Sequence, residues 1–213
     1  SPQLSTHNLK DFFYHVFTRI QLPRDLLILT GTTIDTLDYS SKVLNFGSKA
    51  VFVCAGPVCR QLSTQVPEQL TGVTDTAVVM PGVVAITLPH QTGDLDHQDN
   101  LLSLAINSLN ENLWQNIVLI VVCDQANVVS QSMADFVWHC FTKSDPCHDL
   151  HGKNQRYEGK RWLFDGPLFI DARSKRHHGP VLKPCPDSER RVDQIIAQNP
   201  QLSSLFDQKG AKK

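Results

Sequence analysis

The chain contains an internal repeat. Residues 135–149 read DFVWHCFTKSDPCHD, and 124 positions earlier residues 11–25 read DFFYHVFTRIQLPRD. Six of the fifteen positions are identical without a gap: Asp11/Asp135, Phe12/Phe136, His15/His139, Phe17/Phe141, Thr18/Thr142 and Asp25/Asp149. A match of this length in one register indicates an old duplication. The chain is therefore constrained to contain two copies of one structural unit.

Each copy is predicted to be a helix that ends in a proline-bearing turn and an acid. Asn8 and Ser132 are good helix N-caps, and each has an acid at the third following position. Proline then removes a backbone donor and ends the helix. Asp25 and Asp149 close the turn in this interpretation, because a short acid can accept hydrogen bonds from nearby backbone N–H groups. Both are therefore assigned a structural role.

The two copies differ in what precedes them. Residues 117–123 before the second copy are a continuous apolar run, typical of a strand buried on both faces of a parallel sheet. Only the polar residues 1–7, without an initiator methionine, precede the first copy. We expect a C-terminal fragment of a longer protein, although a natural chain with an incomplete first unit is an alternative. The missing strand should leave an uncovered sheet edge or apolar face. Residues 8–22 should be covered by the second module or by another chain.

The remaining pattern predicts an α/β fold of duplicated units, with a largely parallel or mixed sheet flanked by helices. Strands are expected at 26–29, 50–54, 77–80, 83–88, 117–123 and 162–172, and helices at 8–22, about 96–113, from 132, and 187–196. The expected domains are 1–60 for the end of the first unit, 61–200 for a second, degenerate module, and 201–213 for a tail.

Composition limits the class of protein. Hydrophobic residues make up 41% and charged residues 19%, which is ordinary for a soluble globular chain. A formal net charge of −1 provides no field to attract nucleic acid. No apolar run approaches the 18 residues of a membrane span. The six scattered cysteines suit reduced thiols, so a cytoplasmic location is expected.

Three sequence blocks, in order, resemble a known family. P-R-D at 23–25, I-D-T-L-D-Y-S-S at 34–41 and G-S-K at 47–49 are similar to the C-terminal region of the UbiD decarboxylases. Those enzymes act on 3-polyprenyl-4-hydroxybenzoate and related acids. The family usually continues into a strand ending Asp-Ala-Thr; the first copy lacks this acid, whereas the second has Asp171-Ala172. The resemblance covers residues 8–54 well and 70–196 loosely, and longer members linked to menaquinone synthesis have an extra C-terminal module.

The resemblance implies the activity of a longer parent. Such enzymes use prenylated FMN held with Mn and K ions, and their catalytic and flavin-binding residues lie upstream of the C-terminal region. No stretch here matches those parts, so no catalytic, cofactor-binding or metal-binding residue is assigned to this chain. The family's C-terminal module supports oligomer assembly. We therefore expect an assembly and scaffold region, inactive alone, of a homo-oligomeric carboxy-lyase that releases CO2 from an aromatic acid in ubiquinone or menaquinone biosynthesis. Its partner would be the parent's own N-terminal flavin domain.

One concentrated positive patch is a second candidate site. Its members are Arg173, Lys175, Arg176, His177 and His178. They could bind a phosphate or carboxylate, or contact a neighbouring subunit, although charge runs are commonly just solvated. The competing class of function is a stand-alone small-molecule or anion-binding α/β protein that uses this patch.

Zinc is a further possible ligand. Cys147, His148 and His151, near His139, carry donors that suit zinc. No Cys-x-x-Cys pair supports them, so a surface turn after a helix is favoured.

Overall fold

The computed structural model describes residues 4–89, 100–179 and 185–204. The chain divides into two compact units, Ser1–His178 and Gly179–Lys213. No helix in the described ranges is long and apolar enough to cross a bilayer.

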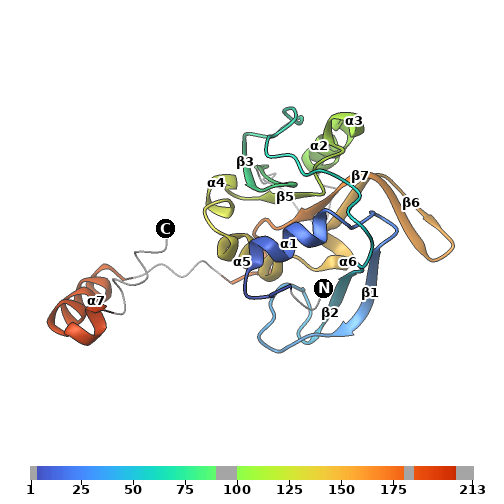
Figure 1. Cartoon of the computed structure of the whole chain (residues 1–213). Coiled ribbons are helices and arrows are strands. Elements are labelled where there is room, and N and C mark those ends of the chain that lie inside the picture. Colours follow the sequence, from blue (N-terminus) through green and yellow to red (C-terminus); the bar gives the residue numbers. More distant parts are fainter. Residues whose placement is uncertain (1–3, 90–99, 180–184, 205–213) are drawn as a thin grey trace. The chain divides into compact units, whose positions relative to one another are not determined.

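The first compact unit is an α/β structure with two sheets (Figure 1). Its helices are α1 (Leu9–Phe17), α2 (Asn100–Ser108), α3 (Glu111–Trp114), α4 (Ala126–Val129), α5 (Met133–Lys143) and α6 (Pro146–Asp149). Its strands are β1 (Leu26–Thr33), β2 (Phe46–Phe52), β3 (Asp75–Met80), β4 (Val83–Thr87), β5 (Leu119–Cys123), β6 (Leu150–Glu158) and β7 (Arg161–Asp171). The mixed, helix-flanked sheet confirms the predicted fold class.

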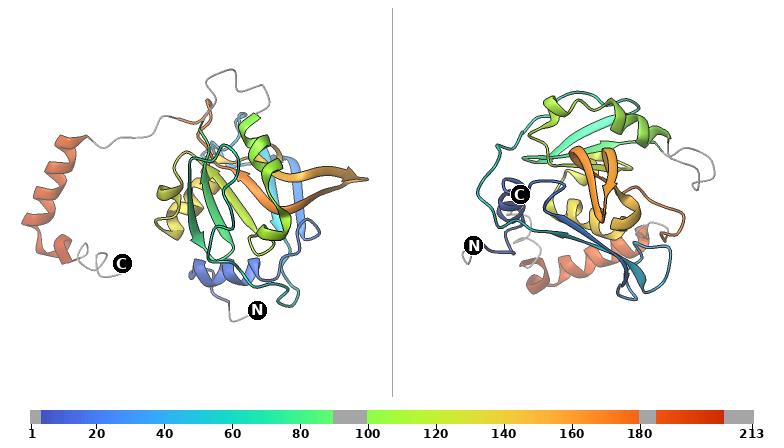
Figure 2. Two further views of the ribbon diagram at one scale, coloured as in Figure 1. Left: turned by 90° about the horizontal axis from the view of Figure 1, so that it is seen from above. Right: turned by 90° about the vertical axis from the view of Figure 1, so that its right-hand side faces the viewer.

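The larger sheet has five strands in the order β3-β4-β5-β7-β6. Strands β4, β5 and β7 are parallel, whereas β3 and β6 are antiparallel to their neighbours. Every residue of β5 is buried, as expected for an apolar run with no polar alternation. Two apolar clusters cover the two faces, one with α2 and α3 and the other with α1, α4 and α5. Figure 2 (left) shows α2 and α5 on opposite sides of this sheet.

Helix α1 is covered by the second half of the chain, one of the two arrangements expected from the sequence. The Phe13 and Phe136 rings meet edge to face with centroids 5.5 Å apart. Phe17 and the following Ile20 are buried in the same cluster. The helix ends at Phe17 rather than residue 22: Arg19 N and Ile20 N both donate to the Val16 carbonyl, at 3.1 and 2.9 Å, and the chain turns before Pro23.

The two repeats, residues 8–54 and 132–172, use the same helix bonds at the same offset. The Asn8 and Ser132 side chains accept hydrogen bonds from Asp11 N and Asp135 N, at 3.3 and 3.1 Å. Seven residues after each of these acids, the hydroxyls of Thr18 and Thr142 each donate to the carbonyl four residues before them, at 2.8 and 2.6 Å. Identical local bonding therefore accompanies the identical residues.

The likeness of the repeats extends through the turn into a hairpin. Asp25 Oδ2 accepts from Gln21 N at 2.9 Å, and Asp149 Oδ2 accepts from Asp145 N at 2.6 Å. Each acid is followed directly by a strand, β1 or β6, which pairs antiparallel with β2 or β7. The helix, turn, acid and hairpin together form the repeated unit.

Several predicted boundaries differ from the structure. The helix expected at 96–113 is two helices, because the Asn110 side chain caps α3 by accepting from Asn112 N; residues 96–99 lie outside the described ranges. Strand β6 was not predicted, since its sequence is mostly polar.

The second compact unit contains α7 (Pro186–Gln198). Its N-cap is Cys185 rather than the expected Asp187, with Pro186 in the first turn, where a missing N–H costs nothing. No α7 residue is buried. Within the predicted tail, residues 201–204 form a helical turn, and 205–213 lie outside the described residues.

Candidate functional site

Two of the three family-like blocks, at 34–41 and 47–49, meet the second repeat at one place. A cavity of about 540 Å3 is lined by residues 40–43 and 46–47 of the first repeat and by Asp145, Cys147–Asp149, Lys175 and His177. We call the polar groups that join the two sides the repeat junction: Ser40, Ser48, Asp145, Asp149, Lys175 and His177. The junction is the candidate functional site.

Ser48 and Asp145 connect the two repeats directly. The Ser48 hydroxyl donates to Asp145 Oδ1 and accepts from Cys147 N at 2.7 Å. Both Ser48 and Asp145 are buried. His148 Nδ1 lies 3.0 Å from the other carboxylate oxygen of Asp145. The G-S-K block is thereby held by the turn of the second repeat.

Asp149 is a buried acid with an unusual titration. Burial raises its pKa to about 6, even though the Lys175 amine lies 3.3 Å from Oδ1 and opposes the increase. Its counterpart Asp25 has a lowered pKa, because Arg24 donates to its carboxylate at 2.6 and 3.0 Å near the surface. Each of the two turn acids accepts a hydrogen bond from the backbone N–H four residues before it, but their electrostatic environments differ.

The positive patch is not one exposed cluster. Arg173 is buried and donates two hydrogen bonds to Asp171, at 2.9 and 2.6 Å. Burial opposes ionisation of Asp171, but these bonds hold its pKa below the ordinary value. The Lys175 amine donates to the carbonyls of Lys143 and Asp171, at 2.6 and 2.8 Å. Arg173 and Lys175 therefore both form hydrogen bonds with neighbouring chain segments.

The other patch residues have different surroundings. His177 Nε2 lies 3.2 Å from the Ser40 carbonyl, which adds a contact between the repeats. His178 Nδ1 accepts from Lys175 N at 3.0 Å, and burial lowers the pKa of His178 to about 4, so it is neutral at pH 7. Arg176 is exposed.

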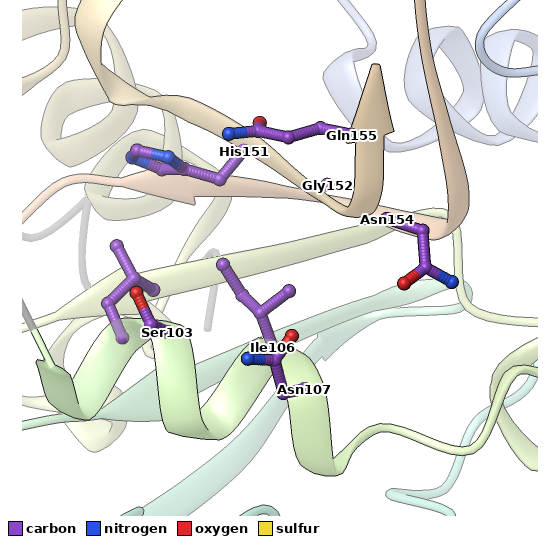
Figure 3. A pocket seen from close by; sticks show the side chains of 8 residues that line it. Ser103, Ile106, Asn107, His151, Gly152, Asn154 and Gln155 are labelled. Carbon is purple, nitrogen blue, oxygen red and sulfur yellow. The ribbon is translucent and has the colours of Figure 1, made fainter.

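The side chains considered for zinc do not gather. In the described ranges no group of three or more His, Cys, Asp or Glu side chains is placed to hold a metal ion. His151 lines a separate cleft of about 470 Å3 between α2 and β6 (Figure 3). Figure 3 shows it on the strand opposite Ser103 of the helix.

Sequence reasoning missed Ser40, Ser48 and Asp145 as junction residues. Ser40 and Ser48 stand in the family-like blocks but carried no individual assignment. Asp145 occupies the position of Gln21 in the first repeat. The change from the Gln21 amide to the Asp145 acid between the repeats could have indicated Asp145 as a junction residue.

Replacing Ser48 tests how strongly the junction holds the repeats together. Ser48→Ala removes the donor to Asp145 and the acceptor for Cys147 N, leaving buried polar groups unpaired. We expect the free energy of unfolding to fall by about 1–3 kcal/mol in urea titration. Ser41→Ala is the matched control, because its hydroxyl only accepts from Val43 N in an exposed turn; it should change stability by less than about 0.5 kcal/mol. Equal losses would contradict this role for Ser48.

Comparison with known proteins identifies the class of protein. Residues 2–54 match the family profile "3-octaprenyl-4-hydroxybenzoate carboxy-lyase C-terminal domain". A protein of Chlamydia pneumoniae, named as one of the subunits of a 4-hydroxybenzoate decarboxylase, is 28% identical over 180 residues, which are 84% of this chain and 29% of that protein. An uncharacterized protein of Chlamydia trachomatis is 30% identical over 75% of this chain and 26% of its own length.

A solved structure is also similar. It is an evolved dimeric form of the UbiD-class enzyme HmfF from Pelotomaculum thermopropionicum in complex with prFMN, with 15% identity and a TM-score of 0.33, over 54% of this chain and 24% of that one. The sequence matches support a UbiD-family C-terminal region in this chain. The chain spans under a third of the length of these curated relatives.

The junction does not fit the groups that the family implies. A flavin phosphate needs cations with donors directed at it, but Arg173 and Lys175 direct hydrogen bonds and charge at Asp171, Asp149 and backbone carbonyls. The described side chains also offer no cluster of three donors for a divalent ion.

Proposed function

We propose that this chain is the C-terminal assembly and scaffold region of a UbiD-like decarboxylase, and that it is not catalytic alone. The observation that carries the proposal is the match of residues 2–54 to the carboxy-lyase C-terminal domain, together with a relative named as part of a decarboxylase. The parent would remove CO2 from an aromatic acid of the polyprenyl-hydroxybenzoate or naphthoate type, in ubiquinone or menaquinone biosynthesis.

The junction geometry supports a structural role for the polar residues of this region. A catalytic group needs a proton, lone pair or charge available to a substrate. At the junction, Ser48 bridges Asp145 and Cys147 N, while Lys175 bonds two carbonyls and Asp149. The Ser48 bonds hold the two repeats together, and the Lys175 bonds tie segments of the second repeat to one another. Prenylated FMN, Mn and K would be bound by the parent's N-terminal domain, which is this region's proposed partner.

The same bonds argue against an anion-binding protein that uses the patch at 173–178. An anion would have to compete with the Asp171 carboxylate for Arg173 and with Asp149 for Lys175. Buried, hydrogen-bonded pairs of this kind are strongly destabilised when one partner is removed.

Ligand titration tests the proposal. The 213-residue chain should bind neither prenylated FMN, in the presence of Mn2+ and K+, nor inorganic phosphate in calorimetry. Sedimentation should show a self-associated species, as expected of an assembly region. Stoichiometric flavin binding would overturn the scaffold assignment. Phosphate binding that is lost in Arg173→Met but kept in Arg24→Met would favour the anion-binding alternative.

A further inference from the structure

The hairpins of the two repeats have different numbers of neighbouring strands. In the second repeat, β7 pairs antiparallel with β6 and, on its other edge, parallel with β5. In the first repeat, β2 pairs with β1 alone among the strands of the described residues. Since helix, turn and hairpin are otherwise alike, the outer edge of β2 corresponds to an edge that is paired in the second repeat.

The repeats also fix which backbone groups lie on that edge. Leu26 pairs with Phe52, and Leu150, 124 positions after Leu26, pairs with Ile170. Phe52 therefore corresponds to Ile170. By the same register Ala50 and Cys54 correspond to Leu168 and Ala172.

Hydrogen bonds show what those positions do in the second repeat. Leu168 N donates to Val118 O at 3.0 Å, and Ala172 N donates to Val122 O at 2.8 Å. In the first repeat Val53 N donates inward to Asp25 O at 2.9 Å. Neighbouring residues of a strand direct their backbone groups to opposite edges, so the N–H groups of Phe52 and Cys54 face outward.

The outer faces of the two hairpins differ in the same way. Phe169 of β7 is fully buried in the cluster that contains Leu102 of α2 and Trp114 of α3. Its counterpart, Val51, is 40% exposed. Leu27 and Val53 on the same face are 54% and 57% exposed. The first repeat thus presents exposed apolar side chains, beside the exposed Lys49 on the same face, where the second is covered by helices.

We propose that the β2 edge and this face are a docking surface for a strand–helix segment. The strand is apolar, like β5, and runs parallel to β2 in the β5–β7 register, and the helix covers Leu27, Val51 and Val53 as α2 and α3 cover Phe169. We assign the segment to the polypeptide that precedes the first repeat in the longer relatives, because this chain spans only 29% of one such protein and 26% of another. Unpaired edges with an apolar face favour strand addition.

The inference rests on the internal repeat and not on decarboxylation, so its failure would leave the proposed function untouched. The chain itself provides the probe. Residues 116–131, which hold β5 and α4, are copied ahead of Asn8 in place of residues 1–7. This copy tests the strand of the proposed segment, because α2 and α3 precede residue 116. The copied strand then has the same spacing from the Asn8 cap as β5 has from the Ser132 cap. The matched control carries the Val121→Pro change in the copied segment alone, because proline removes a ladder donor and is excluded from central strands.

Hydrogen exchange of backbone amides is the measurement. We expect the amides of Ala50, Phe52 and Cys54 to exchange at least about tenfold more slowly in the extended chain than in the proline control, because strand pairing protects them. Leu168 and Ala172 provide an internal reference that should not change. If the extended chain does not fold, the same 16 residues are added as a peptide with terminal lysines to the 213-residue chain, with the same expected protection.

Two results would overturn the inference. Equal exchange at the three amides in the extended chain and its control, and with the peptide, would show that this edge does not accept a parallel strand. Protection of the same amides in the unextended chain that grows with protein concentration would show that a second copy, not an upstream segment, occupies the edge.

Discussion

The Arg173→Met variant is expected to lose about 3–5 kcal/mol of unfolding free energy, the largest effect of any single change considered. Arg173 and Asp171 are both buried and joined by two hydrogen bonds. Removing the guanidinium leaves the Asp171 carboxylate charged in a poorly solvating environment. Urea unfolding followed by circular dichroism measures the loss.

Two further variants separate the loss of the pair from the loss of a large side chain. Arg24→Met breaks a surface pair, Arg24–Asp25, in which the arginine side chain is 58% exposed, and should cost less than about 1 kcal/mol. The double variant Asp171→Val, Arg173→Met removes both charges, and valine is the residue that the first repeat has at this position, as Val53. The double variant should be more stable than Arg173→Met alone. A double variant as unstable as the single would contradict the argument.

The second large effect is the pH dependence contributed by Asp149. Its pKa is raised from an ordinary 3.8 to about 6 in the folded chain, so the folded state binds this proton more tightly than the unfolded state. The contribution is therefore complete below about pH 4 and is lost as the pH rises through about 6. The contribution of Asp149 to the free energy of unfolding is about 3 kcal/mol, because a shift of one pKa unit corresponds to about 1.4 kcal/mol.

Comparison with variants isolates this contribution. Between pH 4 and 7, Asp149→Asn should gain stability relative to the unmodified chain, because the ionisable group is gone. Below about pH 4, Asp25→Asn should show the opposite sign, because the Arg24 hydrogen bond lowers the pKa of Asp25 and the stability that this adds is lost only as the pH falls below the ordinary carboxyl pKa. Unfolding free energies at half-unit pH intervals would test both. Parallel profiles for the unmodified chain and Asp149→Asn would show that Asp149 does not titrate with a raised pKa.

The amount that the sequence could predict follows from how each element is stabilised. Strand β5 was identifiable because all its residues are buried, and burial on both faces requires a continuous apolar run. The caps at Asn8 and Ser132 were identifiable because their bonds are local. Strand β6 was not, because beyond Gly152 its side chains are mostly exposed and only pairing with β7 makes it a strand. The 124-residue offset from β1 could have revealed it.

The junction was less accessible from sequence for a related reason. Ser48 and Asp145 are 97 positions apart and meet only through tertiary packing. The charge run at 173–178 suggested a surface patch. Nothing in the sequence indicated that Asp171 and Asp149 pair with its cations. A basic run becomes structural when acids from other elements lie within hydrogen-bond reach, and sequence order alone does not show this.

Release of CO2 by the isolated chain is the most direct test of the scaffold assignment. Decarboxylation requires an electron sink for the carbanion that remains, which a cofactor normally supplies. The assay supplies prenylated flavin, Mn2+ and K+ with 4-hydroxybenzoate or naphthoate acids. We expect no CO2 above the protein-free background. Turnover by this chain that disappears in Asp149→Ala or Arg173→Ala, with the fold retained, would place a catalytic site here and contradict it.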